Sequence, residues 1–190
     1  MVKLSGILEY SMGGFLCLRG FASFKMLSAI SDSNPDIQRD LISGRTEELS
    51  QYLNRGEYRF FPEVILALNL TDGNSQFDVL SQFHEDLQAG KTWNKNIGDF
   101  EFNISQNKTK NVLGTFSRLP AIDRINIAHL KFDETAHKLS RIDGNHRLSA
   151  ADEVGEDFQT PFCLLLFRDP KEKEVGGQAV LGRQVQTATP

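Results

Sequence analysis

Five consecutive residues have the chemistry of an anion-binding turn: Asp143, Gly144, Asn145, His146 and Arg147. A short strand is predicted over 138–142, and an apolar pattern with the spacing of one helix face follows over 148–154. Gly155 supplies a helix stop. The first N–H groups of a helix lack partners within the helix and attract anions. A strand, a glycine turn and a helix start therefore predict a phosphate-binding site.

Each residue of this turn has a distinct part in such a site. Gly144 lets the backbone turn sharply and approach a ligand closely. Asn145 and His146 offer hydrogen-bond donors, and Arg147 offers a planar charged fork that fits phosphate oxygens. Asp143 would repel a phosphate, so it is expected to cap the turn, orient His146 or hold a metal ion. A second interpretation stays open, in which Asp143 only caps the helix and Arg147 makes a surface ion pair.

Size and charge narrow the class of protein. At 190 residues, the chain is long enough for one domain with a hydrophobic core. Charged residues make up 24% and hydrophobic residues 39%, as in ordinary soluble proteins. The net charge of −4 argues against a protein that coats nucleic acid non-specifically, although 21 Lys and Arg residues leave room for a local basic face.

The two cysteines and the N-terminal segment bear on the compartment. Cys17 and Cys163 both stand among large apolar residues, and we expect buried thiols rather than a disulfide or a reactive site. Two cysteines cannot form a cysteine-rich metal cluster. Charged residues interrupt the apolar N-terminal segment, which fits neither a signal peptide nor a membrane span. We therefore expect a cytoplasmic protein without a membrane partner.

The hydrophobic pattern predicts several elements along one domain over 1–168. Strands are expected near 15–22, 63–70, 124–132 and 161–167, and the run at 63–70 is typical of a strand buried on both faces. Helices are expected over 36–42 and 45–53, and residues up to 30 fit either state. A weaker helical pattern covers 76–88, and one hairpin is expected beyond 90. Residues 169–190 are polar and predict a disordered tail.

The turn and its setting resemble the signature of the DGQHR-domain family, with Asn145 where that family usually has Gln. Upstream pieces are similar to the N-terminal half of that domain: Gln38, Arg39, Asp40, Leu41, Arg45, 49–52, Phe60, Phe61 and Pro62. The resemblance covers roughly residues 15–167. It implies an α/β (α+β) fold of the ParB/sulfiredoxin-like kind, in which helices flank a small mixed sheet.

The resemblance also implies a function. The family includes DndB-type transcriptional regulators of DNA phosphorothioate modification systems, and in ParB-like members the equivalent turn cradles nucleotide phosphates. For this chain it implies ATP or CTP with Mg²⁺ as cofactor. DNA, nucleotide and other proteins of a modification or phage-defence operon are the implied partners, and an oligomer is compatible with it. In sulfiredoxins the equivalent turn carries a reactive cysteine. Asn145 stands there and has no thiolate, which argues against that chemistry.

Three hypotheses follow. In the first, the turn is a nucleotide-sensing, DNA-associated regulatory site, with Gln38, Arg39 and Arg45 as accessory residues. In the second, the chain is an NTP hydrolase or ParB-like nuclease in which Asp143 and His146 activate water, although no second carboxylate at close spacing completes a metal site. In the third, it is a protein-interaction module that uses the aromatic pair at 60–61.

Overall fold

A computed structural model gives the fold over residues 1–11, 15–33, 44–55, 61–69, 92–108, 124–136, 138–155 and 157–167. The strands are β1 (Val2–Ser11), β2 (Phe15–Ser23), β3 (Ser31–Ser33), β4 (Val64–Asn69), β5 (Trp93–Ile97), β6 (Phe100–Lys108), β7 (Arg124–Phe132), β8 (Leu139–Asp143) and β9 (Gln159–Phe167). The helices are α1 (Phe24–Ala29), α2 (Arg45–Asn54), α5 (Asn145–Ser149) and the 3-10 turn η1 (Ala151–Glu153).

The fold class expected from the sequence is wrong. Strands account for 57% of the described residues, and they join into a nine-stranded curled sheet with few helices. The chain therefore does not have a small sheet flanked by helices, and the ParB/sulfiredoxin-like architecture is not observed. The cause lies in β5 and β6, whose solvent-facing side chains are polar. One solvated face is ordinary for antiparallel strands, but it weakens their signal in a sequence.

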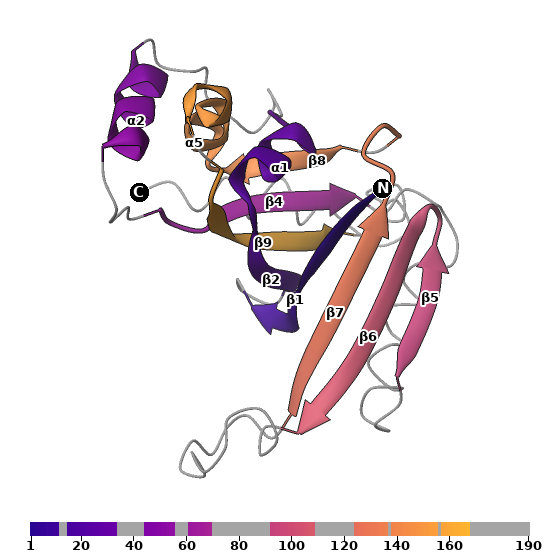
Figure 1. Cartoon of the computed structure of the whole chain (residues 1–190). Coiled ribbons are helices and arrows are strands. Elements are labelled where there is room, and N and C mark those ends of the chain that lie inside the picture. The colour runs from indigo at the N-terminus through magenta and orange to yellow at the C-terminus, as the bar shows by residue number, and fades with distance from the viewer. Residues whose placement is uncertain are drawn as a thin grey trace, which may run out of the picture.

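The strand order is β3-β8-β4-β9-β2-β1-β7-β6-β5 (Figure 1). Neighbouring strands are antiparallel except for the β3–β8 and β4–β9 pairs, which are parallel. The final strand β9 lies between β2 and β4, so it joins strands far apart in the sequence. The sheet thus includes residues from both ends of the described chain.

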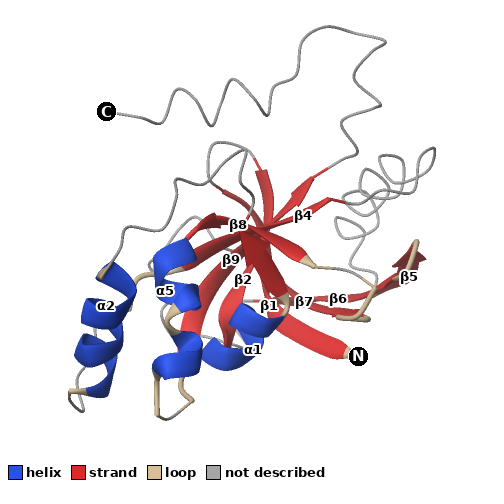
Figure 2. Ribbon diagram, turned by 90° about the horizontal axis from the view of Figure 1, so that it is seen from above, coloured by secondary structure: helices blue, strands red, loops and turns tan. Residues whose placement is uncertain are grey.

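The core lies on the sheet face that α1, α2 and α5 cover. Alternation sets this face, because Leu4 and Leu8 of β1 are buried while Lys3 and Glu9 are exposed. Figure 2 shows the three helices together on one side, with β7, β6 and β5 running away from them. A second, smaller apolar cluster lies on the opposite side of the sheet: Cys17, Ala67, Cys163 and Leu165.

Most predictions for single elements are confirmed. The buried strand at 63–70 corresponds to β4, which has Leu66 and Ala67 buried on its two faces. The elements expected near 15–22, 45–53, 124–132 and 161–167 correspond to β2, α2, β7 and β9. A hairpin beyond 90 is present as β5–β6. The expected helices at 36–42 and 76–88 and the expected tail at 169–190 lie outside the described residues.

Candidate functional site

The turn has the local structure that its sequence predicts. β8 ends at Asp143, Gly144 adopts a left-handed φ of 93°, and α5 begins at Asn145. The Leu148 N–H donates to the Gly144 carbonyl at 2.8 Å, which closes the first helical turn. Glycine is required here for two reasons. A side chain would be strained at this φ, and a Cβ would come within 2.8 Å of the Val64 side chain on β4.

The helix is shorter than the pattern predicts. α5 ends at Ser149, and the 3-10 turn η1 continues the chain. The expected apolar face is nevertheless correct, because Leu148, Ala151 and Val154 are all buried. Gly155 lies after η1, and its N–H donates to Asn54 Oδ1 at 3.1 Å. The segment after the turn is thus fixed by packing against α2 rather than by a long helix.

Arg147 is held inside the protein by several contacts. Its Nη2 donates to Asp143 Oδ2 at 2.6 Å, and its Nη1 donates to the carbonyls of Pro62 and Glu63. The guanidinium lies over the ring of Phe61, 5.5 Å from the centroid. Only 16% of the side chain is exposed. Arg147 therefore ties the turn to the segment that enters β4, which goes beyond the ligand contact expected from the sequence.

The expected cap by Asp143 is not formed. Gly144 occupies the N-cap position of α5, without a side-chain cap, and the Asp143 carboxylate instead accepts from Arg147. This ion pair within the motif matches the second interpretation of the sequence in part, since Asp143 is 61% exposed. Arg147, however, is mostly buried. The pair neutralises much of the charge that the turn would offer to an anion.

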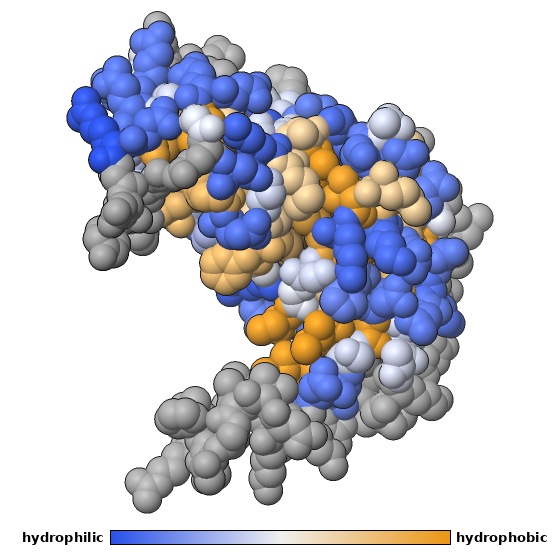
Figure 3. All heavy atoms as spheres, in the orientation of Figure 1, coloured by the Kyte–Doolittle hydropathy of each residue, from blue (hydrophilic) through white to orange (hydrophobic). Residues whose placement is uncertain are grey.

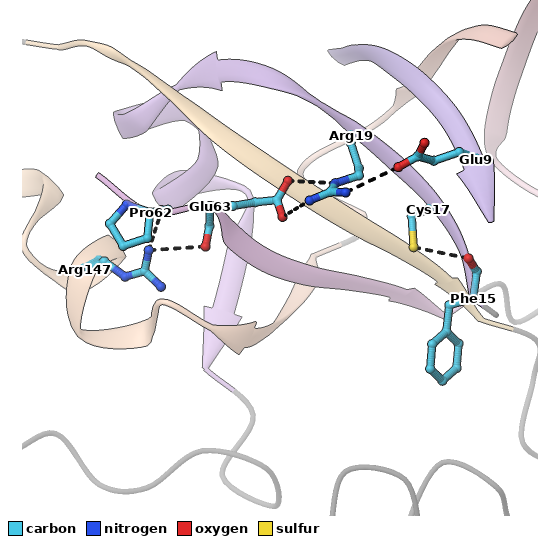
Figure 4. Close-up of polar contacts among 7 residues, drawn as sticks. All are labelled: Glu9, Phe15, Cys17, Arg19, Pro62, Glu63 and Arg147. Atoms are coloured by element: carbon cyan, nitrogen blue, oxygen red, sulfur yellow. Dashed lines mark hydrogen bonds and ion pairs between the residues drawn. The ribbon is translucent and has the colours of Figure 1, made fainter. Parts of the chain in front are cut away.

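A chain of polar contacts extends from Arg147 through Glu63 and Arg19 to Glu9 (Figure 4). Arg19 on β2 grips the Glu63 carboxylate through Nε at 3.0 Å and Nη2 at 2.6 Å, and its Nη1 lies 3.4 Å from Glu9. The bidentate bond to Glu63 raises the pKa of Arg19. Glu63 thus receives Arg19 at its carboxylate and Arg147 at its carbonyl. Sequence reasoning missed this connection, because Arg19 and Glu63 are far apart in the chain.

Arg141 was not among the predicted site residues, yet its guanidinium links the turn to α1 and β3 through hydrogen bonds. The residue is 8% exposed. Its guanidinium donates to Ser31 Oγ at 3.0 Å, to the Ser31 and Ser28 carbonyls at 2.9 and 3.0 Å, and to Ser149 Oγ at 3.3 Å. Burial lowers the pKa of Arg141, and attraction by Asp32 opposes the shift.

Arg141 also fixes the orientation of Asn145. Its Nη1 donates to Asn145 Oδ1 at 3.2 Å, and the Asn145 side chain is buried, with 5% of the residue exposed. Because the oxygen of the amide is held by a donor, the amide nitrogen is left as the group that can donate. Asn145 stands where the DGQHR signature usually has Gln, and its side-chain amide is therefore held in one orientation.

The remaining predicted residues divide into those near the turn and those apart from it. His146 is half-buried, and no hydrogen bond to its enclosed Nδ1 is found in the described part of the chain. Arg45 is exposed at the start of α2, while the contacts of α2 with the segment after the turn involve Ser50 and Asn54 at its other end. Gln38 and Arg39 lie outside the described residues.

The aromatic pair at 60–61 is only half described. Phe61 packs against Phe24 and Phe158, with ring centroids 5.1 and 5.6 Å away, so it belongs to the core under the helices. Phe60 lies outside the described residues.

The residues that the structure describes contain no group of three or more His, Cys, Asp or Glu side chains arranged to bind a metal ion. None of the helices described has the length and apolar character needed to cross a membrane. Comparison with known proteins found no matching family model, no matching curated protein and no matching solved structure.

Proposed function

We propose that the chain is a regulatory phosphate-binding protein, in which the turn from Asp143 to Arg147 holds a nucleotide or a DNA phosphate. The observation that carries the proposal is the turn itself, with left-handed Gly144 directly before two potential donors, the Asn145 amide and His146. Arg141 supports it by leaving the Asn145 amide nitrogen free to donate. The resemblance of these residues to the DGQHR signature favours a role beside DNA modification or defence enzymes.

The Asp143–Arg147 pair supplies a physical reason for regulation. A phosphate that enters the turn competes with the Asp143 carboxylate for the Arg147 guanidinium. Mg²⁺ would change this competition. The exposed Asp143 carboxylate repels a bare phosphate, but it is attracted to a metal ion bound to the phosphate oxygens. ATP or CTP with Mg²⁺ is therefore the ligand class that the turn favours over a bare phosphate.

Binding is favoured over catalysis by the same contacts. A general base must be available to accept a proton, but the Asp143 carboxylate is engaged with Arg147. The hydrolase and nuclease hypotheses therefore have less support than ligand binding. A protein-interaction role for the pair at 60–61 has less support as well, since Phe61 is packed in the core.

Calorimetry tests the proposal. ATP, CTP, GTP and a short DNA duplex are titrated into the protein with and without Mg²⁺, which separates a mononucleotide from polymer phosphate. Asn145→Asp should weaken binding about tenfold or more, because a carboxylate in place of the amide nitrogen repels phosphate yet still accepts from Arg141. Asp152→Asn, at an exposed position after the turn, is the matched control and should bind like wild type. Absence of binding to every ligand would refute the proposal.

A further inference from the structure

Glu63, the residue directly before β4, is held by two arginines at different atoms (Figure 4). Its carboxylate accepts from Nη2 and Nε of Arg19 on β2, at 2.6 and 3.0 Å. Its backbone carbonyl accepts from Nη1 of Arg147 at 3.3 Å. A guanidinium that grips both oxygens of a carboxylate fixes its geometry as well as its charge. The acid of Glu63 therefore points toward β2, away from the arginine that contacts its own carbonyl.

The charges around Arg147 favour an anionic ligand only while the Glu63 carboxylate is kept elsewhere. Asp143 already accepts from Nη2 of Arg147 at 2.6 Å, so one acid of the motif neutralises this arginine. If the Glu63 carboxylate were released, it could rotate toward Arg147, because the guanidinium lies against the Glu63 backbone. Two acids at one arginine leave a net negative charge, which repels a phosphate.

Arg19 is bound more firmly to Glu63 than to its other acidic neighbour, Glu9. The contact with Glu9 is a single one of 3.4 Å, against two shorter bonds to Glu63. The Glu9 side chain is 44% exposed and that of Glu63 is 26% exposed, so solvent screens the pair with Glu9 more strongly. Glu9 also belongs to β1, which lies on the other side of β2 from β9 and β4. The charge of Arg19 is therefore directed mainly at the acid beside the turn.

We propose that Arg19 is a positioning residue of the phosphate site, which holds the Glu63 carboxylate at β2 and so keeps Arg147 available to the ligand. This inference rests on the phosphate-binding function proposed above. Arg19 contacts no ligand itself and acts through Glu63. Asp143 then remains as the acid that a phosphate displaces from Arg147. The affinity of the site is thereby set in part from β2, which β9 separates from β4.

A purely structural role for the Arg19–Glu63 pair predicts a different pattern among variants. If the pair only attached β2 to the segment before β4, removing either partner would loosen the same segment and weaken the site equally. If Arg19 acts by holding a charge, its removal is harmful, but removal of the Glu63 charge is not, because no carboxylate is then released. Glu63→Gln should therefore rescue Arg19→Met, and this non-additivity distinguishes the two roles.

Calorimetry with ATP, CTP, GTP and a short DNA duplex, each with Mg²⁺, tests the inference on the full chain. Every ligand that wild type binds should bind Arg19→Met about fivefold more weakly, the size of a favourable, partly exposed ion pair. Glu63→Gln should bind like wild type, and Arg19→Met combined with Glu63→Gln should regain wild-type affinity. Arg19→Lys keeps the charge without the planar fork, so it should lose less affinity than Arg19→Met.

Lys131→Met is the matched control. It breaks an ion pair of similar exposure, in which Lys131 of β7 bonds Glu101 of β6 at 2.9 Å, and it should bind every ligand like wild type. Figure 3 shows a group of hydrophilic side chains over these two strands, so solvent readily compensates the loss of one charge there. Urea unfolding of each variant verifies that it is folded before the titration.

The possible results separate this inference from the phosphate site on which it rests. If wild type binds none of the four ligands, the proposed function fails and this inference fails with it. If wild type binds a ligand and Arg19→Met binds it equally well, Arg19 does not position the site. If Glu63→Gln does not restore affinity to Arg19→Met, the ion pair has only a structural role, and this inference is overturned while the phosphate site remains.

Discussion

Arg147 Nη2 lies 2.6 Å from Asp143 Oδ2, so the strongest cation of the Gly144 turn is paired with an anion of the same motif. The remaining contacts of Arg147, with the Pro62 and Glu63 carbonyls and the Phe61 ring, fix the segment that leads into β4. A ligand at the turn therefore acts on a group that also holds the sheet together. Ligand binding at the turn can therefore change the packing of the segment before β4, because Arg147 contacts both.

Asp143→Asn should increase the affinity for a metal-free phosphate ligand. The amide keeps the shape of the side chain but removes the charge that competes for Arg147. Because Asp143 is 61% exposed, solvent screens the pair, and the gain should be up to about fivefold. Calorimetry with ATP in EDTA measures it, with Glu153→Gln, an exposed position beyond the helix, as control. Lower affinity in the variant would contradict competition at Arg147.

Gly144→Ala should destabilise the protein more than Gly44→Ala. Both glycines have positive φ, 93° and 82°, so each substitution carries backbone strain of about 1 to 2 kcal/mol. At Gly144 the new Cβ also meets Val64 Cγ1 at 2.8 Å, whereas nothing lies within 4 Å at Gly44. Overpacking should raise the loss at Gly144 to about 2 to 4 kcal/mol. Urea unfolding compares the two variants, and equal losses would show that the contact with Val64 relaxes freely.

The turn could be predicted because its signals are local. A glycine, a cluster of donors and the apolar spacing of Leu148, Ala151 and Val154 all lie within a few residues of one another. The buried strands β4 and β9 were predictable for the same reason, since continuous apolar runs identify them.

The size of the sheet could not be predicted in this way. β6 places Phe102 and Ile104 on its buried face but Asn103 and Ser105 on the other, and its Asn-rich sequence resembles a loop. Contacts between distant residues leave no local signal either. Arg141 bonds Ser31, 110 residues away, and nothing beside either residue indicates the pairing.

Arg141→Met should destabilise the protein by about 3 kcal/mol. The substitution keeps most of the volume but removes the donors that satisfy the Ser28 and Ser31 carbonyls, and a buried acceptor left without a partner is costly. Thermal or urea unfolding measures the loss. Arg55→Met, at the exposed end of α2, is the matched control and should change stability by less than about 0.5 kcal/mol. A similar small change at both positions would show that Arg141 does not organise the turn.

Cys17 and Cys163 should resist thiol reagents in the folded protein. Both residues are 0% exposed, and neither forms a disulfide. A hydrogen bond with Cys17, together with burial, raises the pKa of Cys163, and the protonated thiol is a poor nucleophile. Reaction with Ellman's reagent should be slow in buffer and should reach both thiols in guanidinium chloride. Rapid reaction of either thiol in buffer would show that the apolar cluster around them opens readily.

His129 should make folding less favourable as the solution becomes acidic. Desolvation, and then the charges of Lys3 and Lys131, lowers the pKa of this imidazole below its ordinary value of 6.5. As the pH falls below 6.5, the unfolded chain takes up the proton first, so the free energy of unfolding decreases; above 6.5 the contribution of His129 is constant. His129→Gln should lose this part of the pH dependence in urea unfolding between pH 7.5 and 5.

An NMR titration of the His129 ring separates the two causes. Lys3→Met should raise the midpoint toward the ordinary value, because it removes one of the positive charges, while the contribution of desolvation remains. Added salt should have the same direction of effect, since it screens the lysines and leaves the buried environment unchanged. A midpoint that neither Lys3→Met nor salt moves would show that the two lysines do not act on His129.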